Sequence, residues 1–246
     1  QFADLGLVII DEQHRFGVEQ RATLTERGEE YRQRLLAFMD EHVYPAESVY
    51  REQMRASGDA NHHPQVLEDL KAEARSQGLW NLFHPHPEWG PGLTNLEYAH
   101  LAEITGRSLE IAPEAINCNA PDTGNMELLH LRGTPAQQEE FITGTLNGTR
   151  RVTFGLTEPY HGSDATHMET RAVPESRNGV PGYVINGEKM WTTGMHVATH
   201  CATFCRTGGN DGDAKGITCL LVPTGTAGMT VDEYMWTFNM PTDHQR

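Results

Sequence analysis

The chain has 246 residues, enough to bury a sizeable core in one large domain or two ordinary ones. Lysine and arginine number 19 against 34 aspartates and glutamates, so the net charge of −15 opposes the phosphate backbone of nucleic acid. The four cysteines are too few for a disulfide framework, and no stretch reads as a membrane span or a signal peptide. We therefore expect a cytoplasmic protein that binds neither nucleic acid nor membranes.

The beginning of the chain predicts a buried strand that ends in charged side chains. Residues 5–21 read LGLVIIDEQHRFGVEQR, in which an apolar run leads directly into Asp11 and Glu12. The stretch resembles the D-E-Q-H motif of RecG-type ATP-dependent DNA helicases, whose acidic pair would hold magnesium and activate water. However, the chain has no G-x-x-x-x-G-K-[ST] phosphate loop. We therefore interpret residues 1–28 as a helicase-like orphan segment, which makes the chain an apparent chimera.

The next part of the chain has the apolar spacing of helices. The spacing predicts a helix over residues 29–44 that Pro45 closes, and a second helix that starts at Pro64 and stops at Gly78. These two helices would begin an all-helical domain over residues 29–148.

Two capping-box spacings mark further helix starts. TNLE at residues 94–97 predicts a helix from Asn95 to about Thr105, and TPAQ at residues 134–137 predicts one to about Thr143. Between them, a loop leads into a helix from about Gly124.

From residue 151 the pattern changes to period two, with β-branched and aromatic residues. Asn186-Gly187 predicts a tight hairpin, and the glycine- and aspartate-rich residues 207–216 predict a longer turn. The expected fold is α+β, an all-helical domain followed by an antiparallel β-domain over residues 149–246. The segments that read as strands are RVTFGLT (151–157), YVINGEKMWTT (183–193), VATHCATFCR (197–206), GITCLLVP (216–223) and MTVDEYMW (229–236).

Two loops in this half carry groups that suit a cofactor. GLTEP at residues 155–159 is followed by GSD at 162–164, and such hydroxyls and exposed amides can hold a flavin ring edge and a pyrophosphate. Together with GEKMWTTG at 187–194, this loop resembles the two flavin-contacting signatures of the acyl-CoA dehydrogenase family, T-E-P…G-S-D and K-x-W-[IT]-[ST]. The resemblance continues upstream through RLLAFMDEHVYPAE, LKAEARSQGLWNLFHP, TNLEYAHLAEITGRS and NCNAPDTGNMELL, so it covers about residues 29–246.

The resemblance implies an FAD cofactor and a set of residues that contact it. Thr157 would hydrogen-bond the ring, and Trp191 would cover the ring face that the substrate does not use. Ser163 would lie where the pyrophosphate and the substrate come close, so it is a candidate for binding both. The full set of candidate cofactor-binding residues is Phe154, Leu156, Thr157, Ser163, Trp191, Thr192 and Thr193.

The resemblance also implies a reaction, the α,β-dehydrogenation of an acyl-CoA thioester with hydride transfer to flavin. The family's base is a glutamate of a C-terminal helical domain, which we expect beyond Arg246. Glu158 lies in the cofactor loop and is not a candidate for this role. We accordingly expect a truncated enzyme of fatty acid metabolism that is inactive as an isolated chain. Electron-transfer flavoprotein is the expected electron acceptor, and the full-length protein is expected to be a homo-oligomer.

Two other functions stay open at this point, a helicase fragment and a non-catalytic scaffold that binds flavin or acyl-CoA. No metal site is expected, because His196, His200, Cys201 and Cys205 follow a strand and lie too far apart to share one ion.

Overall fold

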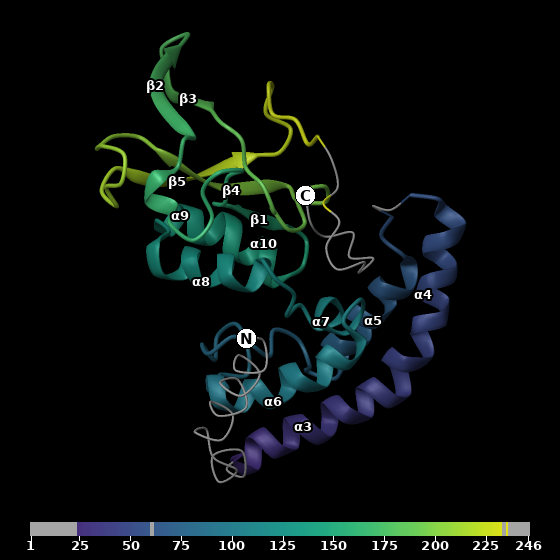
Figure 1. Ribbon diagram of the computed structural model, residues 1–246. Coiled ribbons are helices and arrows are strands. Elements are labelled where there is room, and N and C mark those ends of the chain that lie inside the picture. The colour runs from purple at the N-terminus through teal and green to yellow at the C-terminus, as the bar shows by residue number, and fades with distance from the viewer. Residues whose placement is uncertain (1–23, 60–61, 233–234, 236–246) are drawn as a thin grey trace, which may run out of the picture. The chain divides into compact units, whose positions relative to one another are not determined.

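The computed structural model describes residues 24–59, 62–232 and 235 (Figure 1). The strand expected at Val8-Ile9-Ile10 and the acidic pair that follows it lie outside these residues. No helix in the described part of the chain is long and apolar enough to cross a membrane.

The described residues separate into two compact units. The first, which we call the helical unit, takes the described residues up to Tyr50 together with Val66–Ile116. The second, which we call the sheet unit, takes Arg51–Gln65 and the described residues from Asn117 onward. The domain boundaries expected after residues 28 and 148 stay predictions.

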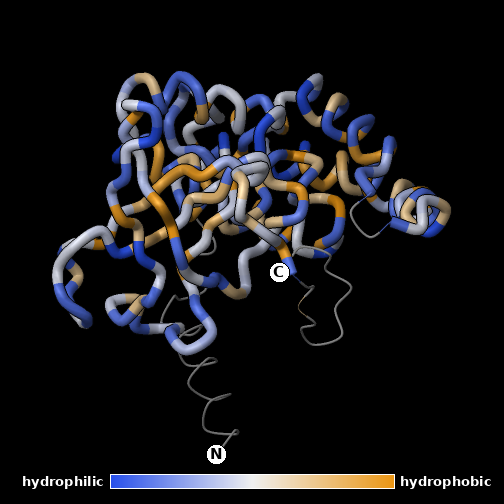
Figure 2. The backbone as a smooth tube through the Cα atoms, turned by 90° about the horizontal axis from the view of Figure 1, so that it is seen from above, coloured by the Kyte–Doolittle hydropathy of each residue, from blue (hydrophilic) through white to orange (hydrophobic). Residues whose placement is uncertain are grey.

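The helical unit buries apolar side chains between its helices. Along the backbone tube of Figure 2, hydrophobic and hydrophilic residues alternate in the helices. Helix α3 packs against α6, with Leu35 and Leu101 fully buried. Burying one such leucine contributes about 1.5–3 kcal/mol. The elements are α3 (Glu26–Phe38), the π-helical turn η1 (Met39–Val43), α4 (Tyr44–Ser57), α5 (Gln65–Ser76), α6 (Asn95–Thr105), the 3-10 turn η2 (Gly106–Ser108) and α7 (Ala112–Ala115). The second half of α4, from Arg51, is assigned to the sheet unit.

The prediction that Pro45 ends the first helix is wrong. The chain stays helical through Pro45 because the turn before it widens: the Tyr44 amide bonds to the Met39 carbonyl, five residues back, in the π-helical turn η1. Proline lacks an N–H and its ring would clash with the carbonyl four residues earlier in a regular helix. A π-turn avoids this conflict, and Pro45 then falls in the first turn of α4, where proline is tolerated.

Both capping boxes are confirmed. The Thr94 side chain accepts from the Glu97 amide at 3.3 Å, and the Glu97 carboxylate accepts from the Thr94 amide at 2.8 Å. Thr134 and Gln137 repeat the arrangement. Helix α6 spans the predicted residues, whereas the helix after Thr134 continues beyond the expected end to Leu146.

The sheet unit consists of short helices followed by a five-stranded sheet in the order β1-β4-β2-β3, with β5 paired to β4. In Figure 1 the helices α8, α9 and α10 lie along one side of this sheet. The elements are α8 (Asp122–Arg132), α9 (Pro135–Gln137), the π-helical turn η3 (Gln138–Ile142), α10 (Thr143–Leu146), β1 (Val152–Gly155), the 3-10 turn η4 (Ala165–His167), β2 (Arg171–Arg177), β3 (Val180–Asn186), β4 (His200–Arg206) and β5 (Ile217–Pro223).

The expected order of a helical region and then a β-domain is confirmed, but the sheet is mixed rather than wholly antiparallel. Strand β1 pairs with β4 in parallel, with Val152 opposite His200. The pairs β2–β3 and β4–β5 are antiparallel. The residues between β1 and β4 contain the β2–β3 hairpin, and this long connection lets β4 return parallel to β1. The last predicted strand is not confirmed, since residues 229–232 have no regular secondary structure.

The predicted hairpin at Asn186-Gly187 is also wrong, because β2 and β3 turn at Asn178-Gly179 instead. Asn178 has φ 53° and Gly179 has φ 78°, the positive pair that a type I′ turn requires. Gly187 serves a different purpose. A Cβ at this position would lie 2.3 Å from Thr170 Oγ1 and 2.6 Å from Thr170 Cα, so glycine here permits a close approach of two backbones.

Candidate functional site

The sequence-predicted site residues all lie in the sheet unit, at β1 and on two loops. Phe154 belongs to β1, and the loop that follows carries Leu156, Thr157 and Ser163. Trp191, Thr192 and Thr193 lie on the segment between β3 and β4. This second segment is not the predicted strand, because residues 187–199 have no regular strand structure. We call residues 156–164 the first loop and residues 187–199 the second loop.

Hydrogen bonds join the two loops, although the bonded residues lie more than thirty positions apart in the sequence. The Met190 amide donates to the Thr157 carbonyl at 2.9 Å. The Lys189 ammonium donates to the Leu156 carbonyl at 3.0 Å. The Thr153 hydroxyl of β1 donates to the Thr193 carbonyl. Leu156, Thr157 and Thr193 take part in these bonds through their carbonyls, and Trp191 and Thr192 lie between the bonded residues Met190 and Thr193.

A buried ion pair reinforces this junction. The Lys189 ammonium lies 2.7 Å from Glu158 Oε1, and the two side chains are 12% and 3% exposed. Backbone amides of Thr170, at 3.0 Å, and of Glu169, at 2.5 Å, also donate to the carboxylate. Burial would raise the pKa of Glu158, but the Lys189 ammonium and these amides lower the pKa to about 2. Glu158 is therefore ionised at any physiological pH.

The aromatic side chains of the candidate set are partly exposed to solvent, whereas the Thr192 hydroxyl is buried. Phe154 is 38% exposed and Trp191 43% exposed, and the Phe154 ring packs on Phe204 with 4.8 Å between centroids. Trp191 has φ 59°, a left-handed conformation that is an outlier for a bulky residue. Thr192 is 5% exposed, and its hydroxyl has no hydrogen-bond partner among the described residues. A buried hydroxyl without a partner is unfavourable by about 1–3 kcal/mol, so it marks a position where a ligand could supply one.

Ser163 is exposed, and its surroundings on the first loop are rich in charge. Asp164 accepts from the Thr166 amide at 3.0 Å and starts the turn η4. His161 lies 3.5 Å from Glu169, and His167 lies 3.1 Å from Asp211. These histidines face carboxylates on other segments.

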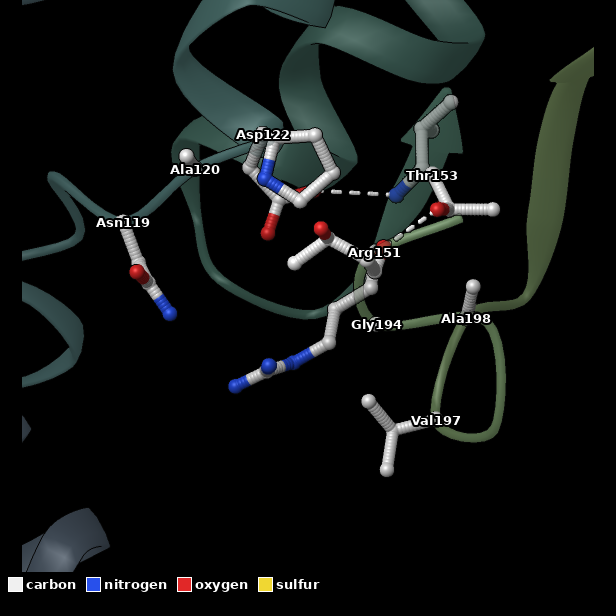
Figure 3. A pocket seen from close by; sticks show the side chains of 11 residues that line it. Asn119, Ala120, Asp122, Arg151, Thr153, Gly194, Val197 and Ala198 are labelled. Carbon is white, nitrogen blue, oxygen red and sulfur yellow. Dashed lines mark hydrogen bonds between the residues drawn. The ribbon is translucent and has the colours of Figure 1, made fainter. Parts of the chain in front are cut away.

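Gly194, Val197 and Ala198 of the second loop line part of a small pocket (Figure 3). The dashed lines in Figure 3 mark the bond from the Val152 amide to Asp122 and that from Thr153 to the Thr193 carbonyl. Of the candidate residues, only Thr193 lines the pocket. Asp122 and Arg151 also line the pocket and were not among the predicted site residues, although Asp122 lies in APDTGNMELL (120–129), one of the segments that carry the family resemblance. The pocket is lined by residues of three segments, among them Asn119, Asp122, Arg151, Thr153, Thr193 and Val197.

Sequence reasoning also missed the Glu158–Lys189 contact. Glu158 belongs to the T-E-P motif and Lys189 to the K-x-W motif, so both residues were recognised in the sequence. Their pairing was not, because no local periodicity relates positions 31 residues apart.

Comparisons with known proteins agree on one family. A model of "Acyl-CoA dehydrogenase, middle domain" matches residues 153–243, a range that contains both loops. "Probable acyl-CoA dehydrogenase FadE2" of Mycobacterium tuberculosis is 47% identical over 207 residues, covering 82% of this chain and 49% of the relative. "Acyl-CoA dehydrogenase family member 10" of Mus musculus is 40% identical over 208 residues, covering 81% of this chain and 19% of the relative.

Solved structures show the same fold. A structure described as "a putative acyl-CoA dehydrogenase from Mycobacterium abscessus" is 39% identical, with a TM-score of 0.79 over 91% of this chain and 57% of that one. The acyl-CoA dehydrogenase of Bacillus anthracis, whose structure contains FAD, is 22% identical, with a TM-score of 0.65 over 91% of this chain and 35% of that one. The chain thus spans about half of the first relative's length. On these likenesses, the chain belongs to the acyl-CoA dehydrogenase family.

Proposed function

We propose that the two loops of the sheet unit bind FAD, and that the whole protein oxidises an acyl-CoA thioester at its α and β carbons. The observation that carries this proposal is the buried Thr192 hydroxyl, which has no partner among the described residues and sits within the loop junction. Family membership supports the same ligand, because the related Bacillus anthracis structure contains FAD.

The residues present fit a flavin in three respects. The Thr192 hydroxyl can donate to a polar ring edge that reaches into the junction. Phe154 and Trp191 are partly exposed aromatic side chains, which a planar ring can pack against. At Gly162 an added Cβ would meet nothing within 4 Å, so the first loop leaves its backbone open to a phosphate group beside Ser163.

In this proposal the flavin, when bound, supplies a two-electron acceptor for a hydride from the acyl chain. Thr157, Thr192 and Thr193 orient the ring, and Trp191 excludes water from one of its faces. Ser163 contacts the cofactor pyrophosphate and the substrate. We further propose that electrons pass to an electron-transfer flavoprotein and that the whole protein forms a homo-oligomer.

FAD titration of the purified chain tests the cofactor assignment. We expect binding with a shift of the flavin absorption bands, and a marked loss of affinity in Thr192→Val, which keeps the shape and removes the hydroxyl. Thr207→Val, in the turn between β4 and β5, is the matched control and should bind like the wild type. Wild-type protein that binds no FAD would refute the assignment.

The reaction is tested on the protein encoded by the complete gene, with an acyl-CoA and an electron-accepting dye. Reduction of the dye supports the dehydrogenase assignment. A protein that binds FAD but reduces no dye with any acyl-CoA tested would instead point to a non-catalytic scaffold.

The helicase resemblance of residues 1–28 stays a prediction. Most of this segment lies outside the described residues, and the relatives reported above are acyl-CoA dehydrogenases. We propose that two unrelated coding pieces are joined at about residues 22–30, and sequencing native DNA across these codons tests the join. A continuous dehydrogenase reading frame that lacks the helicase residues would mark the join as artificial.

A further inference from the structure

We propose that the Glu158–Lys189 ion pair is the positioning device of the FAD site, because it fixes the backbone from which Trp191 and Thr192 extend. The inference rests on the proposed function above, and it assigns to Glu158 and Lys189 a role that goes beyond stabilising the fold.

One carboxylate connects three segments of the sheet unit. Oε1 of Glu158 accepts from the Lys189 ammonium of the second loop at 2.7 Å and from the Thr170 amide at 3.0 Å. Oε2 accepts from the Glu169 amide. Residues 169 and 170 lead directly into β2, so Glu158 ties both loops to the start of a strand.

Lys189 adds a second connection between the two loops. Its ammonium also donates to the Leu156 carbonyl at 3.0 Å, and the next amide along the chain, that of Met190, donates to the Thr157 carbonyl at 2.9 Å. The backbone of the second loop is therefore fixed to the first loop immediately before Trp191. Few degrees of freedom remain between this attachment and the two residues that would contact the ring.

The conformation of Trp191 shows why such an attachment is needed. A tryptophan at φ 59° is strained by about 1–3 kcal/mol and persists only where surrounding contacts impose the conformation. On one side the chain passes Thr170 so closely that only glycine fits at position 187. On the other side the Lys189 and Met190 bonds hold it. Without the ion pair, the strain would relax and Trp191 and Thr192 would move.

A purely stabilising role explains the pair less well. Replacing a whole buried ion pair by apolar residues of similar volume is often neutral for stability, although removing one partner alone is destabilising, so stability by itself does not require an ion pair at this position. Its hydrogen bonds are directional, however, and they specify one arrangement of the two loops. Fixing a loop in the geometry that a ligand requires increases affinity, since less conformational freedom is lost on binding.

The test measures FAD affinity and the visible spectrum of bound FAD for Lys189→Met, Glu158→Gln and the double variant. The controls are Lys215→Met and Glu188→Gln, which change exposed residues. We expect each single variant to weaken FAD binding by about tenfold or more, as loss of a positioning partner typically does. We expect the double variant to be no weaker than the worse single variant, since both changes break one interaction. The bands of the remaining bound flavin should shift relative to the wild type, because its surroundings have moved.

Circular dichroism without FAD separates positioning from folding, and Lys189→Arg serves as the second variant. Arginine keeps the charge but cannot place a single ammonium between the Leu156 carbonyl and Glu158, so we expect an affinity between those of wild type and Lys189→Met. Wild-type FAD affinity and an unchanged flavin spectrum in Lys189→Met would overturn the inference. The same result in both Lys189→Arg and Glu158→Gln would also overturn it. Failure of wild-type and control proteins to bind FAD would instead refute the proposed function.

Discussion

Replacing Glu158 by glutamine should destabilise the sheet unit at neutral pH and affect it much less in acid. Glutamine has nearly the shape of glutamate but lacks the negative charge of the ionised carboxylate. In the folded chain, burial opposes ionisation of Glu158, but Lys189 and two backbone amides lower its pKa from 4.5 to about 2. The difference between these two values corresponds to about 3 kcal/mol of folding free energy at neutral pH. Because the side chain is 3% exposed, solvent screening removes little of it.

The sign follows from the direction of the change. The folded-state pKa is lowered, so the stabilisation is complete above pH 4.5 and disappears as the pH falls toward 2. We expect the free energy of unfolding of the wild type to exceed that of Glu158→Gln by about 3 kcal/mol at pH 7 and by about 1 kcal/mol at pH 3. Urea unfolding followed by circular dichroism at both pH values measures this, with Glu188→Gln as the exposed control. An equal difference at pH 7 and pH 3 would show that the charge of Glu158 contributes nothing.

Three further predictions concern single positions. Gly187→Ala should lower the free energy of unfolding by about 3 kcal/mol, because its Cβ would overlap the backbone of Thr170, whereas Gly162→Ala should leave the melting temperature unchanged and weaken FAD binding. Unchanged stability in Gly187→Ala would contradict the close approach. Thr94→Ala removes a helix cap and should reduce the free energy of unfolding by about 1 kcal/mol in urea denaturation. Cys219 is half-buried, and burial raises its pKa to about 12, so iodoacetamide at pH 8 should modify this thiol more slowly in the folded chain than in urea, and equal labelling rates would contradict the prediction.

The two capping boxes located their helix starts, whereas the first helix starts at Glu26, three residues before the predicted residue 29. A capping box depends on two side chains three residues apart, and at Thr94 the structure shows both of its bonds. Helix continuation was harder to predict. Pro45 obeys the rule that proline disrupts a regular helix, but the chain resolves the conflict with a π-turn rather than an end. Whether a helix continues through a π-helical turn or ends at the proline depends on packing on both sides of the proline. The spacing of apolar residues in the sequence does not encode this packing.

The hairpin error has a similar cause. Asn186-Gly187 and Asn178-Gly179 carry the same two letters, and both follow or precede β-branched residues. Only the second pair forms the turn, since it lies between β2 and β3 in the register that pairs Val173 with Val184. At Gly187 the need for glycine comes from Thr170, 17 positions away. A glycine that permits a long-range contact looks the same in sequence as one that forms a turn.

The family motifs indicated which residues belong to the candidate site, but they left the role of Glu158 undefined. Excluding it as a catalytic base rested on its place in the cofactor loop alone. The structure adds a physical reason, because a general base works best when its pKa lies near the working pH, and a carboxylate with a pKa of about 2 is a weak proton acceptor at neutral pH. Both of its oxygens also accept hydrogen bonds from the chain, so protonation would disrupt the junction of the two loops. The same contacts that make Glu158 unsuitable for proton transfer make it suitable for holding the loops in one arrangement.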